Sequence, residues 1–168
     1  LNANFALMNN DPVKGPAKYT NGVYCDGVSS YLSIDSIKNT KFTEYTVHSW
    51  VKLTNYTEFG TIFGTATDGR TWLGIDSDGF IQFRVFAGNT LYSTPLENNT
   101  KAALDTWYHV AATYSETDNS LRLYVNGTLA TNETISSSDS IKTTGNKNYI
   151  CRGQDGHFLN GTVDNIAV

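Results

Sequence analysis

Paired carboxylates are the first candidates for chemistry in this chain, because two on one strand can act as acid and nucleophile. Alternate residues of a strand share a face, so an acid at i and another at i+2 or i+4 would stand close together. The glutamates are Glu44, Glu58, Glu97, Glu116 and Glu133, and none has such a partner within a strand-like run. Asp76 and Asp78 are two apart but flank "DSDG", which is typical of a turn. These residues predict that the protein is not an enzyme.

Aromatic and planar polar side chains form the second pattern. In "FIQFRVF" alternate residues are apolar and face the core, which leaves Gln82 and Arg84 outside, and "LRLYV" leaves Arg122 and Tyr124 outside in the same way. Sugars stack C–H faces on aromatic rings and hydrogen-bond to planar groups. We therefore predict a ligand-binding face on a curved sheet. Its candidate residues are Trp72, Arg84, Gln82, Arg70, Arg122 and Tyr124. The alternative for each is an ordinary surface or half-buried position.

The elements that would position these side chains are strands. Only 17% of the residues are charged, against about 25% in an average domain, and no segment keeps a 3.6-residue period. Short apolar runs alternate with Gly, Asn and Asp, which predicts an all-β sandwich or barrel. The predicted strands are 23–25, 31–34, 45–53, 60–65, 71–75, 80–86, 108–114, 121–125, 128–135, 149–151 and 161–168.

The stretch "WYHVAATYSETDNSLRLYVNG" gives the most detailed prediction. Two alternating runs flank a polar loop, and the second ends in Asn126-Gly127, the residue pair that type I′ turns favour. Residues 107–135 are therefore expected to form a three-stranded meander with one face in the core.

Charge and composition exclude some partners. The net charge is −4 without acidic or basic blocks, so neither nucleic acid nor a membrane surface is an expected partner. No apolar run approaches the ~18 residues of a membrane-spanning helix. The chain is expected to be one domain, residues 1–168, excised from a longer protein. Five Asn-x-Thr sequons, at Asn55, Asn98, Asn126, Asn132 and Asn160, favour secretion.

Four segments resemble one known family. "LDTWYHVAATYSETDNSLRLYVNGTLA", "VYCDGVSSYLSI", "FTEYTVHSWVKL" and "GHFLNGTVDNIAV" occur in the order typical of the laminin-G-like, concanavalin-A-like domains, in their bacterial and pentraxin-related branch. The resemblance implies a jelly-roll β-sandwich of two curved antiparallel sheets. It also implies that Trp50 and Trp107 serve as core packing.

The resemblance carries two further expectations. Cys25 and Cys151 have no C-x-x-C spacing and could be free thiols, but the family places their strands near each other at the chain-end seam, which implies a disulfide. Related domains can hold a structural Ca²⁺ between the first and last strands, and the matching acids are Asp26 and Asp164. The alternative is that Asp26 only caps a turn and Asp164 accepts hydrogen bonds.

The resulting functional expectation is a non-catalytic carbohydrate-binding module, extracellular or at the cell surface, in an adhesin or a carbohydrate-active enzyme. Its partner would be a glycan or polysaccharide. The first alternative is an adhesion or spacer domain that binds protein partners. The second is a glycoside hydrolase or lyase, against which the missing carboxylate pair argues.

Overall fold

The computed structural model consists of two antiparallel β-sheets, which confirms the predicted all-β class. It describes residues 7–9, 13–15, 17–19, 22–35, 41–65, 71–95, 100–136, 140–142 and 147–168. Within these ranges the only helical element is η1, a 3-10 turn at Gln154–Gly156. None of the helices in this part is long and apolar enough to cross a membrane.

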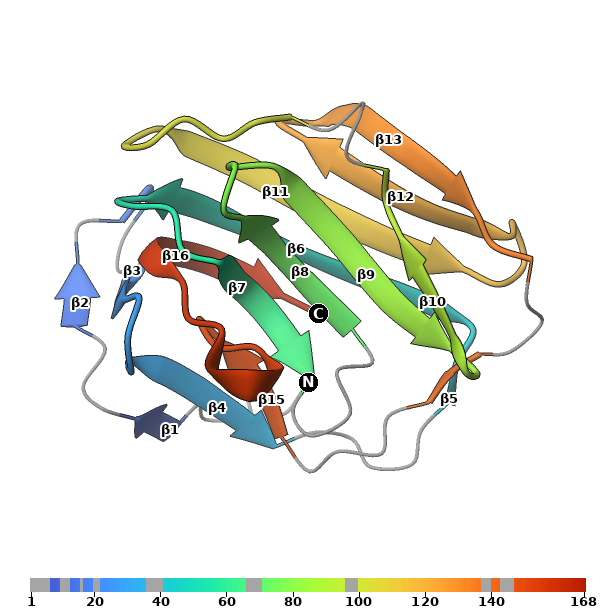
Figure 1. Cartoon of the computed structure of the whole chain (residues 1–168), viewed down its shortest axis with the longest axis horizontal. Coiled ribbons are helices and arrows are strands. Elements are labelled where there is room, and N and C mark those ends of the chain that lie inside the picture. Colours follow the sequence, from blue (N-terminus) through green and yellow to red (C-terminus); the bar gives the residue numbers. More distant parts are fainter. Residues whose placement is uncertain are drawn as a thin grey trace.

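The sheet that we call sheet A has nine strands, all paired antiparallel. Its order is β1 (Leu7–Asn9), β4 (Tyr31–Asp35), β15 (Lys147–Ile150), β7 (Phe59–Thr65), β8 (Thr71–Asp76), β9 (Ile81–Ala87), β14 (Ile141–Lys142) and β5 (Lys41–Phe42), and β10 (Thr90–Ser93) also pairs with β9. Figure 1 shows its central strands β7, β8 and β9 in front of the other sheet.

Sheet B has seven strands. Its order is β13 (Thr128–Thr134), β12 (Ser120–Val125), β11 (Trp107–Ser115), β6 (Glu44–Leu53), β16 (Asn160–Ala167), β3 (Gly22–Asp26) and β2 (Val13–Gly15). Strands β11, β12 and β13 lie side by side, so the predicted meander over 107–135 is confirmed (Figure 1). The last strand, β16, lies between β6 and β3, so the end of the described chain pairs with an early strand in the same sheet.

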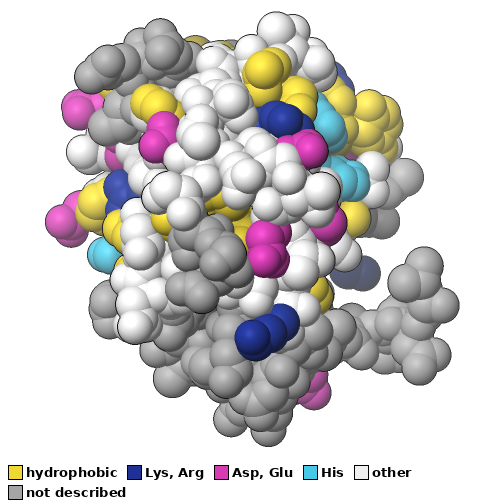
Figure 2. Space-filling model, turned by 90° about the vertical axis from the view of Figure 1, so that its right-hand side faces the viewer, with side chains coloured by type: hydrophobic (Ala, Val, Ile, Leu, Met, Phe, Trp, Pro, Cys, Tyr) yellow, Lys and Arg dark blue, Asp and Glu magenta, His cyan; other side chains and the backbone are white. Residues whose placement is uncertain are grey.

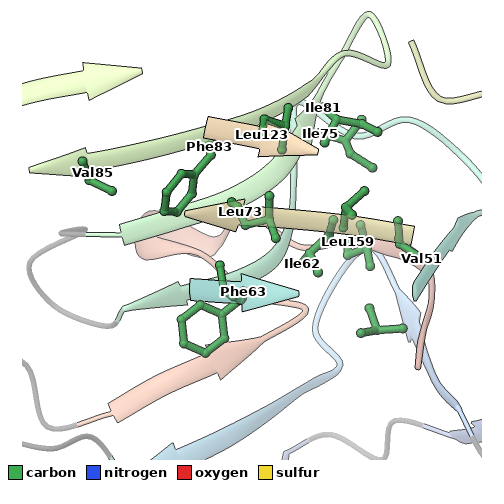
Figure 3. Packing of buried hydrophobic residues seen from close by; sticks show 14 of the residues in the cluster. Val51, Ile62, Phe63, Leu73, Ile75, Ile81, Phe83, Val85, Leu123 and Leu159 are labelled. Atoms are coloured by element: carbon green, nitrogen blue, oxygen red, sulfur yellow. The ribbon is translucent and has the colours of Figure 1, made fainter. Parts of the chain in front are cut away.

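The core lies between the two sheets and follows the alternation of the sequence. Phe83 and Leu73 reach inwards from sheet A, and Leu123 and Val51 from sheet B; each is at most 1% exposed (Figure 3). Burying a side chain of this size contributes about 1.5–3 kcal/mol relative to leaving it in water. Because every second residue is committed to this core, the residues between them must point away from it.

Five short strands were not predicted from the sequence. They are β1, β2, β5, β10 and β14, each with two to four residues. Two of them, β1 and β2, precede residue 22, where no strand was predicted. Such short segments carry too few residues for alternation to show. Their positions depend on pairing with long strands such as β9 and β3.

Candidate functional site

A small cleft lies on the outer face of sheet A. It is lined by Phe59, Gly64, Thr65, Thr71, Trp72, Arg84, Phe86, Leu91, Gln154 and His157. Its volume of about 170 Å³ is below the ~300–1,000 Å³ of sites for drug-sized ligands. The cleft therefore suits a small, ring-sized group.

A row of paired residues across the sheet explains why the cleft forms there. Tyr149 is paired with Gly64, Gly64 with Trp72, Trp72 with Arg84, and Arg84 with Ser93. Directly paired residues on neighbouring strands point to the same side of a sheet. All five residues therefore share the outer face, and Gly64 interrupts their row because it has no side chain.

A second glycine lets the Trp72 indole lie close to the sheet. A Cβ at Gly74 would come within 2.7 Å of Cε2 of Trp72 and 2.6 Å of the Gly60 carbonyl oxygen, so only glycine fits there. The indole Nε1–H donates a hydrogen bond to Oγ1 of Thr61 at 2.8 Å. Glycine inside a strand often marks such a close approach. Trp72 is thus held as part of the cleft lining by both its ring and its N–H.

Arg84 is held over the aromatic rings by a chain of polar contacts. Its Cζ lies 5.0 Å from the ring centroid of Trp72 and 5.3 Å from that of Phe59. Nε and Nη2 both donate to Oε1 of Gln82, at 3.1 and 2.8 Å. Nε2 of Gln82 donates to Oδ2 of Asp76 at 2.8 Å. Gln82 is 1% exposed, and these bonds satisfy a buried amide that would otherwise be costly.

Asp76 also fixes the turn that joins β8 to β9. Its Oδ1 accepts hydrogen bonds from the backbone N–H groups of Asp78 and Phe80, at 3.0 and 2.9 Å. The sequence-based reading of this segment as a turn is therefore confirmed. The same carboxylate supports Gln82 and, through it, Arg84, a positioning role that the sequence did not predict.

Arg84 has no direct carboxylate partner among the described residues. Burial lowers the pKa of the Arg84 guanidinium, and the charge of Asp76 acts in the opposite direction. An arginine nevertheless stays protonated at neutral pH. Among the described residues, salt bridges join Arg122 to Asp118 and Lys147 to Asp35, and none involves Arg84.

One rim of the cleft is a short loop that ends in the predicted disulfide. Cys25 and Cys151 are bonded, with 6.2 Å between their Cα atoms, and both are fully buried. Leu159 N–H donates to the Cys151 carbonyl at 3.1 Å, and Gly153 N–H donates to the His157 carbonyl at 2.8 Å. These bonds close the loop at its base. The His157 ring lies 5.0 Å from the Phe59 ring, centroid to centroid.

The structure divides the predicted ligand-binding residues between two faces. Trp72, Gln82 and Arg84 come together on sheet A, whereas Arg122 and Tyr124 belong to β12 of sheet B. The prediction that all five share one face was wrong. Alternation tells inside from outside, but it does not tell which sheet a strand joins. Arg70 lies outside the described residues.

The prediction that Trp50 and Trp107 are core residues was also wrong. Both are half-buried on the outer face of sheet B, where Trp50 is paired with His109 and Trp107 with Lys52. The Trp50 and His109 centroids are 5.3 Å apart, and those of His109 and His48 are 5.6 Å apart. Figure 2 shows histidine beside hydrophobic side chains at its upper right.

The two candidate calcium ligands do not meet. Asp26 is paired with Asn160, four residues before Asp164 on the same strand, which separates them by about 13 Å. Oδ1 of Asp26 accepts three backbone hydrogen bonds, from residues 28–30, and Oδ2 of Asp164 accepts one from Tyr19 N–H at 3.0 Å. In the described part, no three acidic, histidine or cysteine side chains cluster as metal ligands would. These residues do not fit one shared ion, and calcium binding stays an untested prediction.

Several lining residues had no individual signal in the sequence. Phe59 stands one residue before a predicted strand, and Gln154 and His157 come from the loop after β15. The glycines did carry a signal, since Gly64 and Gly74 interrupt apolar strands where a side chain would normally add packing. Trp72 lies on the opposite side of its strand from the apolar residues Leu73 and Ile75. A search for glycines beside such a tryptophan would have pointed to the cleft.

Solved structures share this fold at low sequence identity. Domain 4 of AbnA, a GH43 extracellular arabinanase from Geobacillus stearothermophilus, in complex with arabinotriose, matches with a TM-score of 0.70 and 18% identity over 96% of this chain and 73% of that one. The botulinum neurotoxin serotype D ligand binding domain, in complex with N-acetylneuraminic acid, matches with a TM-score of 0.72 and 17% identity over 98% of this chain, which spans only 42% of that one.

A SAP-like pentraxin from Limulus polyphemus, a native heptamer, matches with a TM-score of 0.58 and 19% identity over 90% of this chain and 71% of that one. No curated protein matches the sequence. A family model does match, over residues 26–168, and this range includes the cleft, both outer faces and the meander. The chain therefore belongs to the laminin-G-like family of the concanavalin A-like lectin/glucanase superfamily.

Proposed function

We propose that this domain is a non-catalytic carbohydrate-binding module and that the cleft on the outer face of sheet A is its ligand site. The observation that carries the proposal is the lining, where the planar polar group of Arg84 lies over the rings of Trp72 and Phe59 and Phe86 adds a third aromatic ring. Aromatic rings offer faces for sugar C–H groups, and planar donors hydrogen-bond to hydroxyl pairs. Apolar walls with a few fixed polar groups are typical of small-ligand sites.

The structural neighbours support the same class of ligand. The arabinanase domain was solved with arabinotriose and the neurotoxin domain with N-acetylneuraminic acid. Both are saccharides, although they differ in size and charge. Their likeness to this chain supports carbohydrate as the ligand class without naming the sugar.

The acidic residues favour binding over catalysis. Retaining glycosidases hold two carboxyl groups about 5–5.5 Å apart beside the scissile bond. The described lining of the cleft carries no carboxylate pair. Asp76, which supports Arg84 through Gln82, already accepts three hydrogen bonds. The cleft can therefore hold a sugar, but its described residues supply no acid and nucleophile to cleave one.

Two features support a location outside the cell. The disulfide between Cys25 and Cys151 is of the kind that persists in oxidising compartments. The sequons at Asn55 and Asn132 lie at exposed positions. We therefore place the module in a secreted or surface-displayed protein, either an adhesin or a carbohydrate-active enzyme. Repetition in such a parent would compensate for the modest affinity expected of a shallow cleft.

A glycan array with three variants tests the proposal. Wild type should bind at least one glycan with a Kd of about micromolar to millimolar. Arg84→Ala and Trp72→Ala should each weaken binding about tenfold or more. Arg122→Ala, which removes an arginine from the opposite face, should bind as wild type. If no glycan binds, the proposal is wrong and a protein-binding adhesion or spacer role takes its place. If Arg122→Ala alone loses binding, the cleft is not the site.

A further inference from the structure

The charge of the cleft is opposite to that of the whole chain. The chain has a net charge of −4, yet the ionisable side chains in the described lining are Arg84 and His157, both basic types. The cleft therefore presents positive charge within a protein that is negative overall. A positively charged cleft attracts negatively charged ligands and so selects ligands by their charge.

The guanidinium of Arg84 has one edge occupied and one edge available. Gln82 Oε1 accepts from Nε and Nη2, which uses the edge formed by these two nitrogens. A guanidinium has five N–H donors. Nη1 makes no hydrogen bond to any described residue, so the edge formed by Nη1 and the second Nη2–H is not used within this part of the chain. Two parallel N–H donors of this kind match the two oxygens of a carboxylate.

The groups around Arg84 compensate its charge only in part. The rings of Trp72 and Phe59 offer the negative faces of their π systems, and Gln82 offers a neutral carbonyl oxygen. The nearby carboxylate of Asp76 contacts Gln82 instead of Arg84. A half-buried cation without its own carboxylate is stabilised by an anionic ligand more than by a neutral one.

The geometry points to an acidic sugar, one that carries a carboxylate, as the ligand class of this cleft. The carboxylate would take the available edge of Arg84, and the sugar ring would contact Phe59, Phe86 and Leu91, which supply apolar surface to the same cleft. Uronic acids and sialic acids share this chemistry. The inference rests on the proposed function, since it specifies which carbohydrates bind at the same site.

Two ligand pairs, each with an acidic and a neutral member, test the inference. One pair is trigalacturonate and its fully methyl-esterified form, which differ only at the carboxylates; the other is 3′-sialyllactose and lactose. Dissociation constants would be measured by NMR titration for wild type, Arg84→Gln, Arg84→Lys and Arg122→Gln. Arg122→Gln is the matched control, because it removes one positive charge from the outer face of sheet B.

We expect wild type to bind the acidic member of at least one pair about tenfold more tightly, the effect of one charge-assisted hydrogen bond or more. Arg84→Gln should abolish this preference, Arg84→Lys should keep part of it, and Arg122→Gln should keep all of it. The melting temperatures of the variants show whether each is folded. If Arg84→Gln is not folded, Arg84→Lys is the variant that tests the inference.

Three results would overturn the inference. Equal affinity of wild type for both members of each pair, with both weakened by Arg84→Gln, would leave a neutral-sugar site and the proposed function intact. An acidic preference that is undiminished in Arg84→Gln and in Arg84→Lys would place the carboxylate elsewhere. Absence of binding to these four ligands and to the glycan array would contradict the proposed function itself.

Discussion

The two outer faces of the sandwich have similar composition but differ in how much of it a ligand can reach. Each carries tryptophan, histidine and basic side chains. On sheet A, Gly64 interrupts the row and Gly74 lets the Trp72 indole lie close to the sheet, and Trp72 and Arg84 line a cleft. On sheet B, the ring of Trp50 contacts the ring of His109 and that of Tyr19 in the N-terminal segment.

Trp50 shows how the face of sheet B is filled. Its ring is contacted edge-on by Tyr19 at 5.8 Å, by Nζ of Lys18 at 4.9 Å and by the His109 ring at 5.3 Å. Tyr19 is itself held by its N–H bond to Asp164. The tryptophan thus anchors a segment of this chain. Trp72 is also contacted by a cation, Arg84, and by the edge of Phe59, but these residues line a cleft. Aromatic composition alone does not identify a sugar site, because the rings must also border an open space.

The largest predicted effect concerns the disulfide, which joins β3 of sheet B to the loop at the rim of the cleft. The double variant Cys25→Ala, Cys151→Ala removes a cross-link between residues 126 apart in sequence. The free energy of unfolding should fall by about 4 kcal/mol, because the unfolded chain regains loop entropy. Guanidinium titration measures this change. A loss below about 1 kcal/mol would show that the cross-link does not constrain the unfolded chain as expected.

A tryptophan pair separates the two faces. Trp72→Ala and Trp50→Ala each remove one half-buried indole, so each should lower the free energy of unfolding by about 1–3 kcal/mol. Trp72→Ala should also weaken glycan binding about tenfold, because it removes part of the cleft lining and the support of Arg84. Trp50→Ala should leave the affinity unchanged. The reverse pattern on the array would move the site to sheet B.

A side chain at Gly64, the residue that interrupts the row of paired residues on sheet A, should weaken binding and leave the fold intact. A Cβ at Gly64 would lie 3.3 Å from Cγ2 of Thr61 and 3.5 Å from the Arg152 carbonyl oxygen, contacts that small shifts relieve. Gly64→Ala should therefore keep the melting temperature within a few degrees, helped by about 0.5–1 kcal/mol of backbone entropy. Binding should weaken severalfold. Unchanged affinity in both Gly64→Ala and Gly64→Val would mean that the ligand does not occupy this part of the cleft.

The smallest effect is a pH dependence on the face of sheet B. Burial lowers the pKa of His109, and the neighbouring His48 lowers it further. The unfolded chain therefore binds a proton at higher pH than the folded chain does, so stability falls as the pH drops below about 6.5, the ordinary value. His109→Gln should flatten the melting temperature between pH 7.5 and 5.5 relative to wild type. An identical slope in both proteins would contradict this role of His109.

Local patterns in the sequence predicted the long strands and their inner faces. In β9 and β12, alternation separates the side chains that face the core from those that face outwards, although the outward-facing Gln82 is itself buried. Which sheet each strand joins depends on pairing between distant segments, so Arg122 was grouped wrongly with Arg84. The disulfide between Cys25 and Cys151 was predicted from the family resemblance and not from a local pattern. The rim residues Gln154 and His157 lie in a loop without periodicity, and the disulfide and backbone hydrogen bonds at its base hold them at the cleft.

The most direct test of the central claim, that ligands bind on the outer face of sheet A, uses the three tryptophans as reporters. Trp72 is on that face, whereas Trp50 and Trp107 are on the face of sheet B. The three indole N–H signals of the ¹⁵N-labelled domain would be assigned with single Trp→Phe variants and followed while a glycan selected on the array is added. We predict that the Trp72 signal shifts with saturation and that the other two stay in place. Shifts confined to Trp50 and Trp107 would contradict it.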